Sequence, residues 1–140
     1  MLVSTKGRYA LRIMIDLAQH DTGEYVVLMD VARRQDISEK YLEGIVASLS
    51  RAGFLQALRG RGGGYRLART PEEYSVGSII REAEGHLAPV ACLKSGDAVC
   101  PNAAECLTLP MWKELDRRID GYLDSVTLAD ILRGTVPVEP

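Results

Sequence analysis

A glycine-rich turn between two short apolar runs is the most restrictive feature of this 140-residue chain. The turn, residues 59–64, reads RGRGGG, and the runs beside it, residues 54–58 and 65–67, carry apolar and aromatic side chains that favour β-strands. The segment therefore predicts a β-hairpin with two arginines at its tip. Cationic charge on a flexible backbone is unusual for a turn that only joins strands, so we expect an anionic partner. A nucleotide-binding loop is the competing interpretation, but the Lys-Ser/Thr pair of a P-loop and a directly following helix are both missing.

A helix with a well-defined start is predicted immediately before the hairpin. Ser38 suits the N-cap position, Ile37 and Leu42 occupy the two positions of a hydrophobic staple, and Gly53 suits the C-cap. Apolar residues recur at helical spacing and predict a buried stripe formed by Leu42, Ile45, Val46 and Leu49. The opposite face, open to solvent or to a partner, carries Lys40, Tyr41, Glu43, Gly44 and Ala47.

Two further helices are predicted on the N-terminal side. Residues 5–20 show one apolar face, made of Ala10, Ile13, Met14 and Leu17. Residues 29–35 form a shorter helix with Arg33 and Arg34 directed outward, and residues 36–38 turn tightly into the capped helix. Two short helices joined by so brief a turn indicate a helix-turn-helix, and the basic hairpin makes it a winged one. The β-prone residues 24–27 are expected to pair with the hairpin.

The distribution of charge agrees with nucleic-acid binding by the N-terminal half. Residues 1–70 hold 11 Lys/Arg and 7 Asp/Glu, a net charge of +4, whereas residues 71–140 hold 6 and 12, a net charge of −6. A basic half joined to an acidic half fits a DNA-binding head on a body with another role. The capped helix has the size of the major groove, and the arginine-tipped hairpin could reach phosphates or the minor groove. For Lys6, Arg8 and Arg12, phosphate contacts and an ordinary basic surface are equally open.

A long helix is predicted near the C-terminus, over residues 111–126, after a shorter one over 76–83. Apolar residues of the long helix recur three and four apart, at Trp112, Leu115, Ile119, Tyr122 and Val126. This is the spacing of a coiled-coil seam, and a helical DNA reader needs a two-fold partner to cover two half-sites, so we expect a homodimer. A helix buried within one chain is the alternative. Thr127 is expected to cap a last helix over 128–132, and the tail to fray.

The three cysteines, Cys92, Cys100 and Cys106, lie together with the spacing C-x7-C-x5-C in a polar segment. Their odd number excludes a complete disulfide framework, and clustered thiolates favour a soft metal or an iron–sulfur cluster. Structural zinc is less well supported because no CxxC pair is present. Unliganded surface thiols, or a redox pair plus a third thiol, are the alternatives. The nearby candidates for a fourth ligand are His86, Asp97 and Glu105, besides a residue from a second subunit.

Composition disfavours several other classes of protein. Hydrophobic content of 46% and charged content of 26% are those of an ordinary globular chain, and no apolar run is long enough to cross a membrane. The N-terminus has no signal-peptide layout, so a cytoplasmic location is expected. No Ser-His-Asp or Cys-His arrangement is visible, and His20 and His86 lie in unrelated segments, so an enzyme is not expected.

Several motifs together resemble a known family. They are TKGRYA at residues 5–10, Ile37-Ser38 followed by residues 41–43, Arg59-Gly60 followed by residues 62–65, and residues 106–108 leading to Trp112. On these motifs the chain resembles, over nearly its whole length, the Rrf family of bacterial winged helix-turn-helix transcription regulators, which includes IscR, NsrR and CymR. The fold so implied is mainly α with a small β-hairpin wing. We expect a DNA-binding domain over 1–84, a cysteine-bearing sensor loop over 85–110, and a dimerisation helix with the C-terminal tail over 111–140.

The resemblance implies a homodimer that binds double-stranded DNA at an inverted repeat, with the capped helix in the major groove and the wing in the minor groove. The resemblance implies that Ser38, Tyr41 and Glu43 on the helix and Arg59 and Arg61 on the wing bind DNA. Lys40 lies on the same face of the helix, and we expect it to bind DNA as well. A glutamate that matches Glu43 helps to discriminate DNA sequence in the family's regulator of cluster assembly. A carboxylate suits this role because it can accept a hydrogen bond from cytosine N4.

The resemblance also implies that Cys92, Cys100 and Cys106 hold a 2Fe–2S or 4Fe–4S cluster that senses iron–sulfur status, redox state or nitric oxide. The chain departs from the family pattern at two points. Its first two cysteines lie further apart than in the cluster-binding members, and the two known fourth-ligand positions hold Leu109 and Arg8. Family members with few cysteines work without a cluster. A cluster-free regulator, or an interaction module controlled by thiol chemistry or by a metabolic-enzyme partner, is therefore the alternative.

Overall fold

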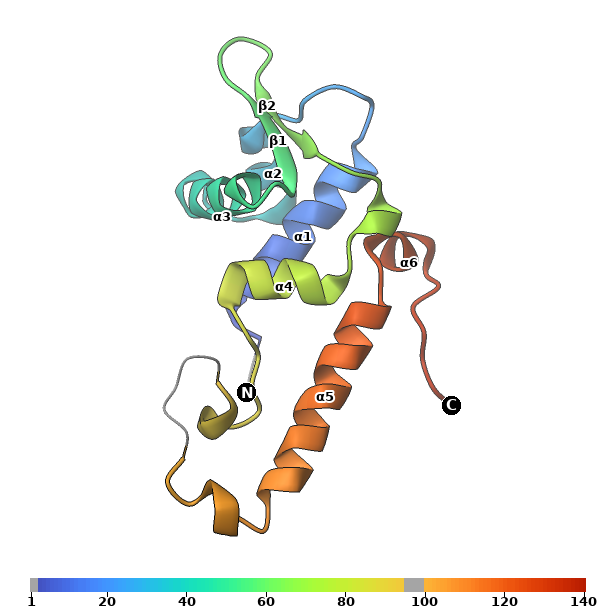
Figure 1. Cartoon of the computed structure of the whole chain (residues 1–140). Coiled ribbons are helices and arrows are strands. Elements are labelled where there is room, and N and C mark those ends of the chain that lie inside the picture. The colour runs from blue at the N-terminus through green and yellow to red at the C-terminus, as the bar shows by residue number, and fades with distance from the viewer. Residues whose placement is uncertain (1–2, 95–99) are drawn as a thin grey trace.

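The computed structural model describes residues 3–94 and 100–140, and these form a mainly helical fold with a two-stranded antiparallel hairpin (Figure 1). The helices are α1 (Thr5–Gln19), α2 (Leu28–Gln35), α3 (Glu39–Arg51), α4 (Val76–Glu84), α5 (Leu109–Ser125) and α6 (Leu128–Arg133). The strands are β1 (Leu55–Leu58) and β2 (Gly64–Leu67), and short 3₁₀ helices lie at Pro71–Glu73, Ala91–Leu93 and Ala103–Glu105. The predicted winged helix-turn-helix is confirmed. No helix in the described ranges has the length and apolar character needed to cross a membrane.

The main core lies around α1, which α2, α3 and α4 cover in the head of the molecule (Figure 1). The predicted apolar face of α1 is buried, with Ala10, Ile13 and Met14 fully covered and Leu17 nearly so. The predicted stripe of α3 packs into the same core, and none of its four residues is more than 2% exposed. Helical periodicity therefore identified both of these core faces correctly.

Helix α3 has the start and the end that its sequence predicts. Ser38 is the N-cap, and its hydroxyl oxygen accepts a hydrogen bond of 3.2 Å from the backbone N–H three residues later. At the other end Gly53 adopts a φ of +80°, a conformation that glycine tolerates best. The N–H groups of Gly53 and Phe54 donate to the carbonyls of Ser50 (3.0 Å) and Leu49 (2.9 Å). This Schellman closure stops the helix and turns the chain into β1.

The wing is a short hairpin, and an extended segment at Val26 pairs with its second strand. Strand β1 pairs with β2 so that Leu58 lies opposite Gly64. Val26 and Tyr65 exchange two backbone hydrogen bonds of 2.8 Å, so the predicted pairing of residues 24–27 with the hairpin is confirmed at Val26. A Cβ atom on Gly64 would lie 2.1 Å from the carbonyl oxygen of Val26, and one on Gly63 would lie 2.3 Å from that of Leu58. Backbone packing therefore requires these two glycines, a role that the prediction of a flexible cationic turn did not include.

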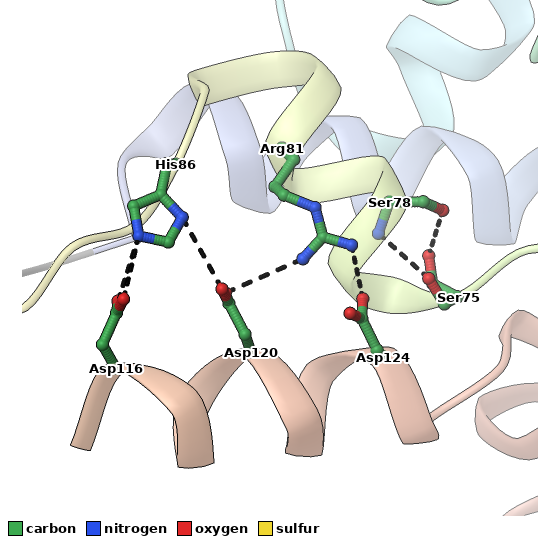
Figure 2. Close-up of polar contacts among 7 residues, drawn as sticks. All are labelled: Ser75, Ser78, Arg81, His86, Asp116, Asp120 and Asp124. Atoms are coloured by element: carbon green, nitrogen blue, oxygen red, sulfur yellow. Dashed lines mark hydrogen bonds and ion pairs between the residues drawn. The ribbon is translucent and has the colours of Figure 1, made fainter. Parts of the chain in front are cut away.

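Helix α5 leaves the head as an arm that reaches down to the cysteine-bearing segment (Figure 1). A polar ladder holds it against α4: Asp116, Asp120 and Asp124, one helical turn apart, face His86 and Arg81 (Figure 2). The Nε2 atom of His86 lies 3.0 Å from Asp116 Oδ1, and its Nδ1 atom lies 3.6 Å from Asp120 Oδ2. Arg81 bridges Asp120 at 3.7 Å and Asp124. Ion pairs therefore line the contact between α4 and this arm.

Among the apolar residues predicted for a coiled-coil seam, Leu115 and Tyr122 are 39% and 48% exposed, and Trp112 and Ile119 are half-buried. Helix α5 has no buried residue, and Met111, which was not part of the predicted seam, is 55% exposed. Val126 is the exception, since it follows the helix and packs in a second small cluster with Val76, Ile80 and Leu87. The alternative of a helix buried within one chain is therefore wrong for α5.

Several boundaries differ from the predicted ones. Helix α5 begins at Leu109, so Pro110 lies in its first turn, where a missing N–H costs nothing. Thr127 caps α6 as predicted, in a reciprocal capping box with Asp130. The tail is held at its start because the Thr135 N–H donates to the Asp130 carbonyl at 2.9 Å and Val136 packs on the second cluster. The expectation of fraying is therefore wrong for these two tail residues.

Candidate nucleic-acid interface and cysteine pocket

The outer face of α3 presents its predicted contact residues to solvent. Lys40, Tyr41 and Glu43 are exposed, with Tyr41 41% exposed. Ser38 is also exposed, but the structure gives its hydroxyl oxygen a capping role and leaves its O–H as a donor toward a partner. A row of one cation, one anion and one aromatic hydroxyl can form hydrogen bonds with base edges as well as with phosphates.

The start of α1 braces this face of α3. The ring of Tyr9 meets the ring of Tyr41 edge-on, with centroids 5.7 Å apart. The Arg12 guanidinium lies 5.2 Å from the Tyr9 ring centroid and donates to the Gln35 side-chain oxygen at 3.0 Å. Arg12 was left open as a phosphate contact or an ordinary surface arginine. Neither interpretation describes it fully, because its side chain bonds Gln35 within the fold. Lys6 and Arg8 are exposed nearby.

The wing places its two tip arginines, Arg59 and Arg61, in solvent. A groove of about 440 Å³ lies between the end of α3 and the wing, and Arg51 and Arg59 line it together with Leu58 and Tyr65. Arg51 therefore adds a cation to the surface that the sequence assigned to α3 and the wing. The sequence carried a signal for it, because Arg51 follows Ala47 by four residues on the exposed face of the helix.

A buried ion pair fixes the helix-turn-helix on α1. The Asp16 carboxylate is 1% exposed, and Arg34 donates to its two oxygens at 2.7 and 3.0 Å while Gln35 donates at 2.9 Å. Burial by itself would raise the pKa of Asp16, but the hydrogen bonds and charge of Arg34 and the hydrogen bond of Gln35 outweigh it and hold the pKa below its usual value. The prediction that Arg34 simply points outward is wrong, because its guanidinium reaches back across α2.

The three cysteines converge on one pocket at the opposite end of the molecule from the wing (Figure 1). Cys92, Cys100 and Cys106 line a cavity of about 170 Å³, whose other walls are Leu93, Ala103, Leu109 and Lys113. All three thiols are free, and Cys92 is exposed while the other two are half-buried. Three thiols around an otherwise mostly apolar cavity are a suitable donor set for an iron–sulfur cluster or a soft metal.

Cys106 has surroundings that favour its thiolate, the form that binds metals and attacks oxidants. Its sulfur lies 3.4 Å from the Thr108 hydroxyl oxygen. Hydrogen bonds from the Thr108 hydroxyl, and then from the backbone of Thr108 and Leu109 at the start of α5, lower the pKa of the Cys106 thiol. Lys113, one turn further along α5, brings a positive charge to the wall of the same pocket.

The candidates for a fourth ligand do not complete this pocket. Both ring nitrogens of His86 face aspartates of α5, and His86 is not among the residues that line the cysteine cavity. Glu105 is exposed and also lies outside the lining. Asp97 lies outside the described residues. Within the described lining, the thiols of Cys92, Cys100 and Cys106 are the usual iron ligands that remain.

Comparison with known proteins identifies the family and supports the fold. The Rrf2 family, described as iron-dependent transcriptional regulators, matches residues 3–134. The regulator IscR of Photobacterium profundum is 38% identical over 133 residues, which are 95% of this chain and 76% of that protein. The structure of T. potens IscR aligns with a TM-score of 0.76 at 41% identity, covering 96% of this chain and 88% of the other.

The structure of CymR, named as the global cysteine regulator of B. subtilis, aligns with a TM-score of 0.78 at 36% identity, covering 96% and 98% of the two chains. The chain belongs to the Rrf2 family. As an Rrf2 protein it is a transcriptional regulator of a DNA-binding family and not an enzyme. The resemblance inferred from its motifs is therefore confirmed, and so is its winged helix-turn-helix fold.

Two features of this Rrf2 chain could not be assigned from sequence motifs. The Asp16–Arg34 pair joins residues 18 apart on different helices, and neither residue breaks the pattern of its own helix. Lys113 lines the cysteine pocket because α5 begins at Leu109. Lys113 therefore lies one helical turn after Leu109, which is another wall of the pocket. Its sequence signal, a four-residue spacing from Leu109, becomes visible only when the helix start is known.

Proposed function

We propose that this protein is a homodimeric regulator that binds an inverted repeat in double-stranded DNA and responds to a signal received at its cysteine pocket. The observation that carries the DNA-binding part is the exposed surface of α3 and the wing. Helix α3 presents Lys40 and Glu43, the wing presents Arg59 and Arg61, and Arg51 and Arg59 line the groove between them. Cations that bind phosphates beside a side chain that reads bases are the usual composition of a sequence-specific surface. We assign residues 1–84 to this function.

The proposed dimer uses the arm formed by α5. Its exposed apolar side chains, Met111, Leu115 and Tyr122, have the spacing of a seam and no covering element within the described chain. Two heads must lie one helical turn of DNA apart, roughly 34 Å, to read both half-sites. A change in residues 85–110 that shifts α5 would therefore change DNA affinity by altering this separation, with residues 111–140 as the dimerisation unit.

Base readout by Glu43 is the sharpest test of the DNA-binding proposal. Sites should first be selected from a random DNA pool with the unaltered protein. On these sites, Glu43→Ala should lower the preference for the correct base pair by roughly tenfold while leaving overall affinity nearly unchanged, because a carboxylate that accepts from cytosine discriminates more than it attracts. Glu39→Ala removes the same charge from the first turn of the same helix and should keep the preference. Equal loss on all sequences would contradict direct readout.

For the signal, we propose that Cys92, Cys100 and Cys106 hold an iron–sulfur cluster, 2Fe–2S or 4Fe–4S. Their convergence on one cavity, the stabilised Cys106 thiolate and the family's description as iron-dependent all support this assignment. A bound cluster would supply one-electron chemistry and reactivity toward oxygen or nitric oxide. The chain's own contribution is three thiolates and the compensating charge of Lys113, and the fourth ligand is left to a residue or molecule not yet assigned.

Protein purified without oxygen should contain iron and sulfide and absorb visible light, and Cys106→Ser should lose most of both. The loss is expected because the other two thiols alone give half of the usual ligand set. Lys113→Gln keeps all three thiols and should keep the iron. A colourless protein without iron, even after reconstitution, would favour the second candidate, a cluster-free regulator controlled by thiol oxidation or a protein partner. The low-pKa thiol of Cys106 is the observation behind that candidate.

A further inference from the structure

Tyr74 lies at a junction that the DNA-binding proposal does not use. It sits between the 3₁₀ helix Pro71–Glu73 and α4, and it is 1% exposed. Its hydroxyl lies at the open end of the wing, where the two strands leave the hairpin. There it donates to the Phe54 carbonyl at 2.7 Å and accepts from the N–H groups of Ala68 at 3.1 Å and Arg69 at 3.0 Å.

These three bonds use the whole capacity of a tyrosine hydroxyl, which has one donor and two acceptor positions. They bind the chain just before β1 to the chain just after β2, so Tyr74 closes the hairpin opposite its tip. The ring is held in place as well: Phe54 lies 5.8 Å away between centroids, and the Arg69 guanidinium lies 4.6 Å from the Tyr74 centroid. A side chain fixed on all sides can transmit its position to both strands.

The wing depends on contacts at its base, where Leu55 enters the main core, Leu67 packs against that core and the Arg66 guanidinium donates to the Gly23 carbonyl at 2.9 Å, in addition to the bonds of Tyr74. A two-stranded hairpin is marginally stable alone, and this one has four pairs of residues and a single buried side chain in β1, Leu55. Its other ties to the head include the pairing of Val26 with Tyr65. The direction in which Arg59 and Arg61 point is therefore set at the base of the hairpin.

The backbone of Tyr74 is tied to the end of the arm. Its carbonyl accepts from the Leu128 N–H at 2.9 Å, and the Val76 N–H donates to the Val126 carbonyl at 2.8 Å. Val126 directly follows α5 and Leu128 begins α6, so this short bridge, which pairs Ser75 with Thr127, joins the backbone beside Tyr74 to the link between α5 and α6. Tyr74 therefore bonds the base of the wing through its side chain and the link that follows the arm through its backbone.

We propose that Tyr74 is a positioning residue for DNA binding, whose hydroxyl holds the wing in the pose that brings Arg59 and Arg61 to the DNA backbone. The inference rests on the proposed DNA-binding function. On this proposal, the DNA affinity that the wing provides depends on the buried Tyr74 hydroxyl at its base as well as on the arginines at its tip. Removal of the oxygen alone leaves the Arg69 N–H without this partner, and it leaves the Ala68 N–H and the Phe54 carbonyl with only their direct bond of 3.2 Å to each other.

The test is a double-mutant cycle with Tyr74→Phe and Arg59→Ala, measured as DNA affinity at several salt concentrations. Tyr74→Phe should weaken binding by roughly tenfold, and Arg59→Ala should cost much less in the Tyr74→Phe background than in the unaltered protein, because a displaced wing no longer delivers its arginines. The salt dependence of Tyr74→Phe should become shallower, as for loss of a phosphate contact. Ser78→Ala removes a half-buried hydroxyl of α4 that donates to the Ser75 carbonyl at 2.7 Å, and it should leave the affinity and its salt dependence unchanged.

Additive losses in the cycle, with an unchanged salt dependence, would overturn the inference while the proposed function stands. If the unaltered protein fails to bind DNA, the proposed function fails instead. Amide hydrogen exchange of the unaltered protein gives a second measurement that needs no variant. The Ala68 and Arg69 amides should exchange far more slowly than those of the tip, and equally fast exchange at both places would also overturn the inference.

Discussion

Replacing Arg34 with alanine is expected to lower the free energy of unfolding by about 3–5 kcal/mol near neutral pH, because it leaves the Asp16 carboxylate buried without its cation. Asp16 is 1% exposed and cannot return to water, whereas the Arg34 side chain is 33% exposed. The reverse change, Asp16→Ala, should therefore cost less than Arg34→Ala, since the freed guanidinium can be hydrated. Urea unfolding of both variants measures this asymmetry.

The penalty of Arg34→Ala should shrink as the pH falls. In the unaltered protein the pKa of Asp16 is lowered, so its contribution to stability is present above the unfolded-state pKa and is lost as the pH falls through the folded-state pKa. In the variant, Arg34 no longer offsets the burial of Asp16, which disfavours the charged carboxylate, so protonation of Asp16 removes the cost of a buried charge as the pH falls. Both effects bring the two proteins closer in stability under acidic conditions.

The matched control is the exposed pair of Asp30 and Arg33 on the same helix. These side chains are 48% and 73% exposed and 3.7 Å apart, so Arg33→Ala should change stability by less than about 1 kcal/mol at any pH. A similar loss for Arg33→Ala and Arg34→Ala would show that the buried pair has no special role in holding the helix-turn-helix.

Removing both wing arginines, with Arg59→Ala and Arg61→Ala together, should weaken DNA binding by about a hundredfold while the protein stays folded. Each guanidinium is exposed and makes no ion pair identified in the described chain, so its loss affects the complex far more than the free protein. If each arginine neutralises one phosphate, the slope of log affinity against log salt should fall in magnitude by about 1.8. Fluorescence anisotropy at several salt concentrations gives both quantities.

Arg133→Ala is the control for this experiment. Arg133 is an exposed arginine that pairs with Glu72, and its helix, α6, lies apart from the wing (Figure 1). The substitution should leave both the affinity and the salt slope as they are. Full affinity in the double wing variant would mean that α3 alone carries DNA binding, and the wing would lose its proposed role.

Local signals in the chain were sufficient for the elements that carry the proposed DNA-binding face. Ser38 could be recognised as an N-cap because capping depends on groups within one turn, and Gly53 as a helix end because a positive φ favours glycine. The buried stripe of α3 followed from helical periodicity alone. The remaining residues of that helix then had to face outward, and Lys40, Tyr41 and Glu43 do so.

Other predictions failed where a long-range contact competes with a local preference. Arg34 has the outward position of its helix but turns back because a buried carboxylate on α1 offers a stronger partner than water. His86 was a candidate ligand by proximity in sequence, yet it faces two aspartates of α5 and is not among the residues that line the cysteine pocket. Neither partner could be found by spacing, because each comes from another element of the fold.

The sequence by itself determined the winged helix-turn-helix, the exposed face of α3 and the clustering of the three cysteines, since caps, periodicity and spacing act within short stretches of chain. The tertiary structure decided how these parts are held. It paired Asp16 with Arg34, placed the Tyr74 hydroxyl at the base of the wing, and set the thiols around one cavity beside Lys113. Such contacts depend on the close packing of distant segments, where a buried polar group must find a partner or lose its solvation.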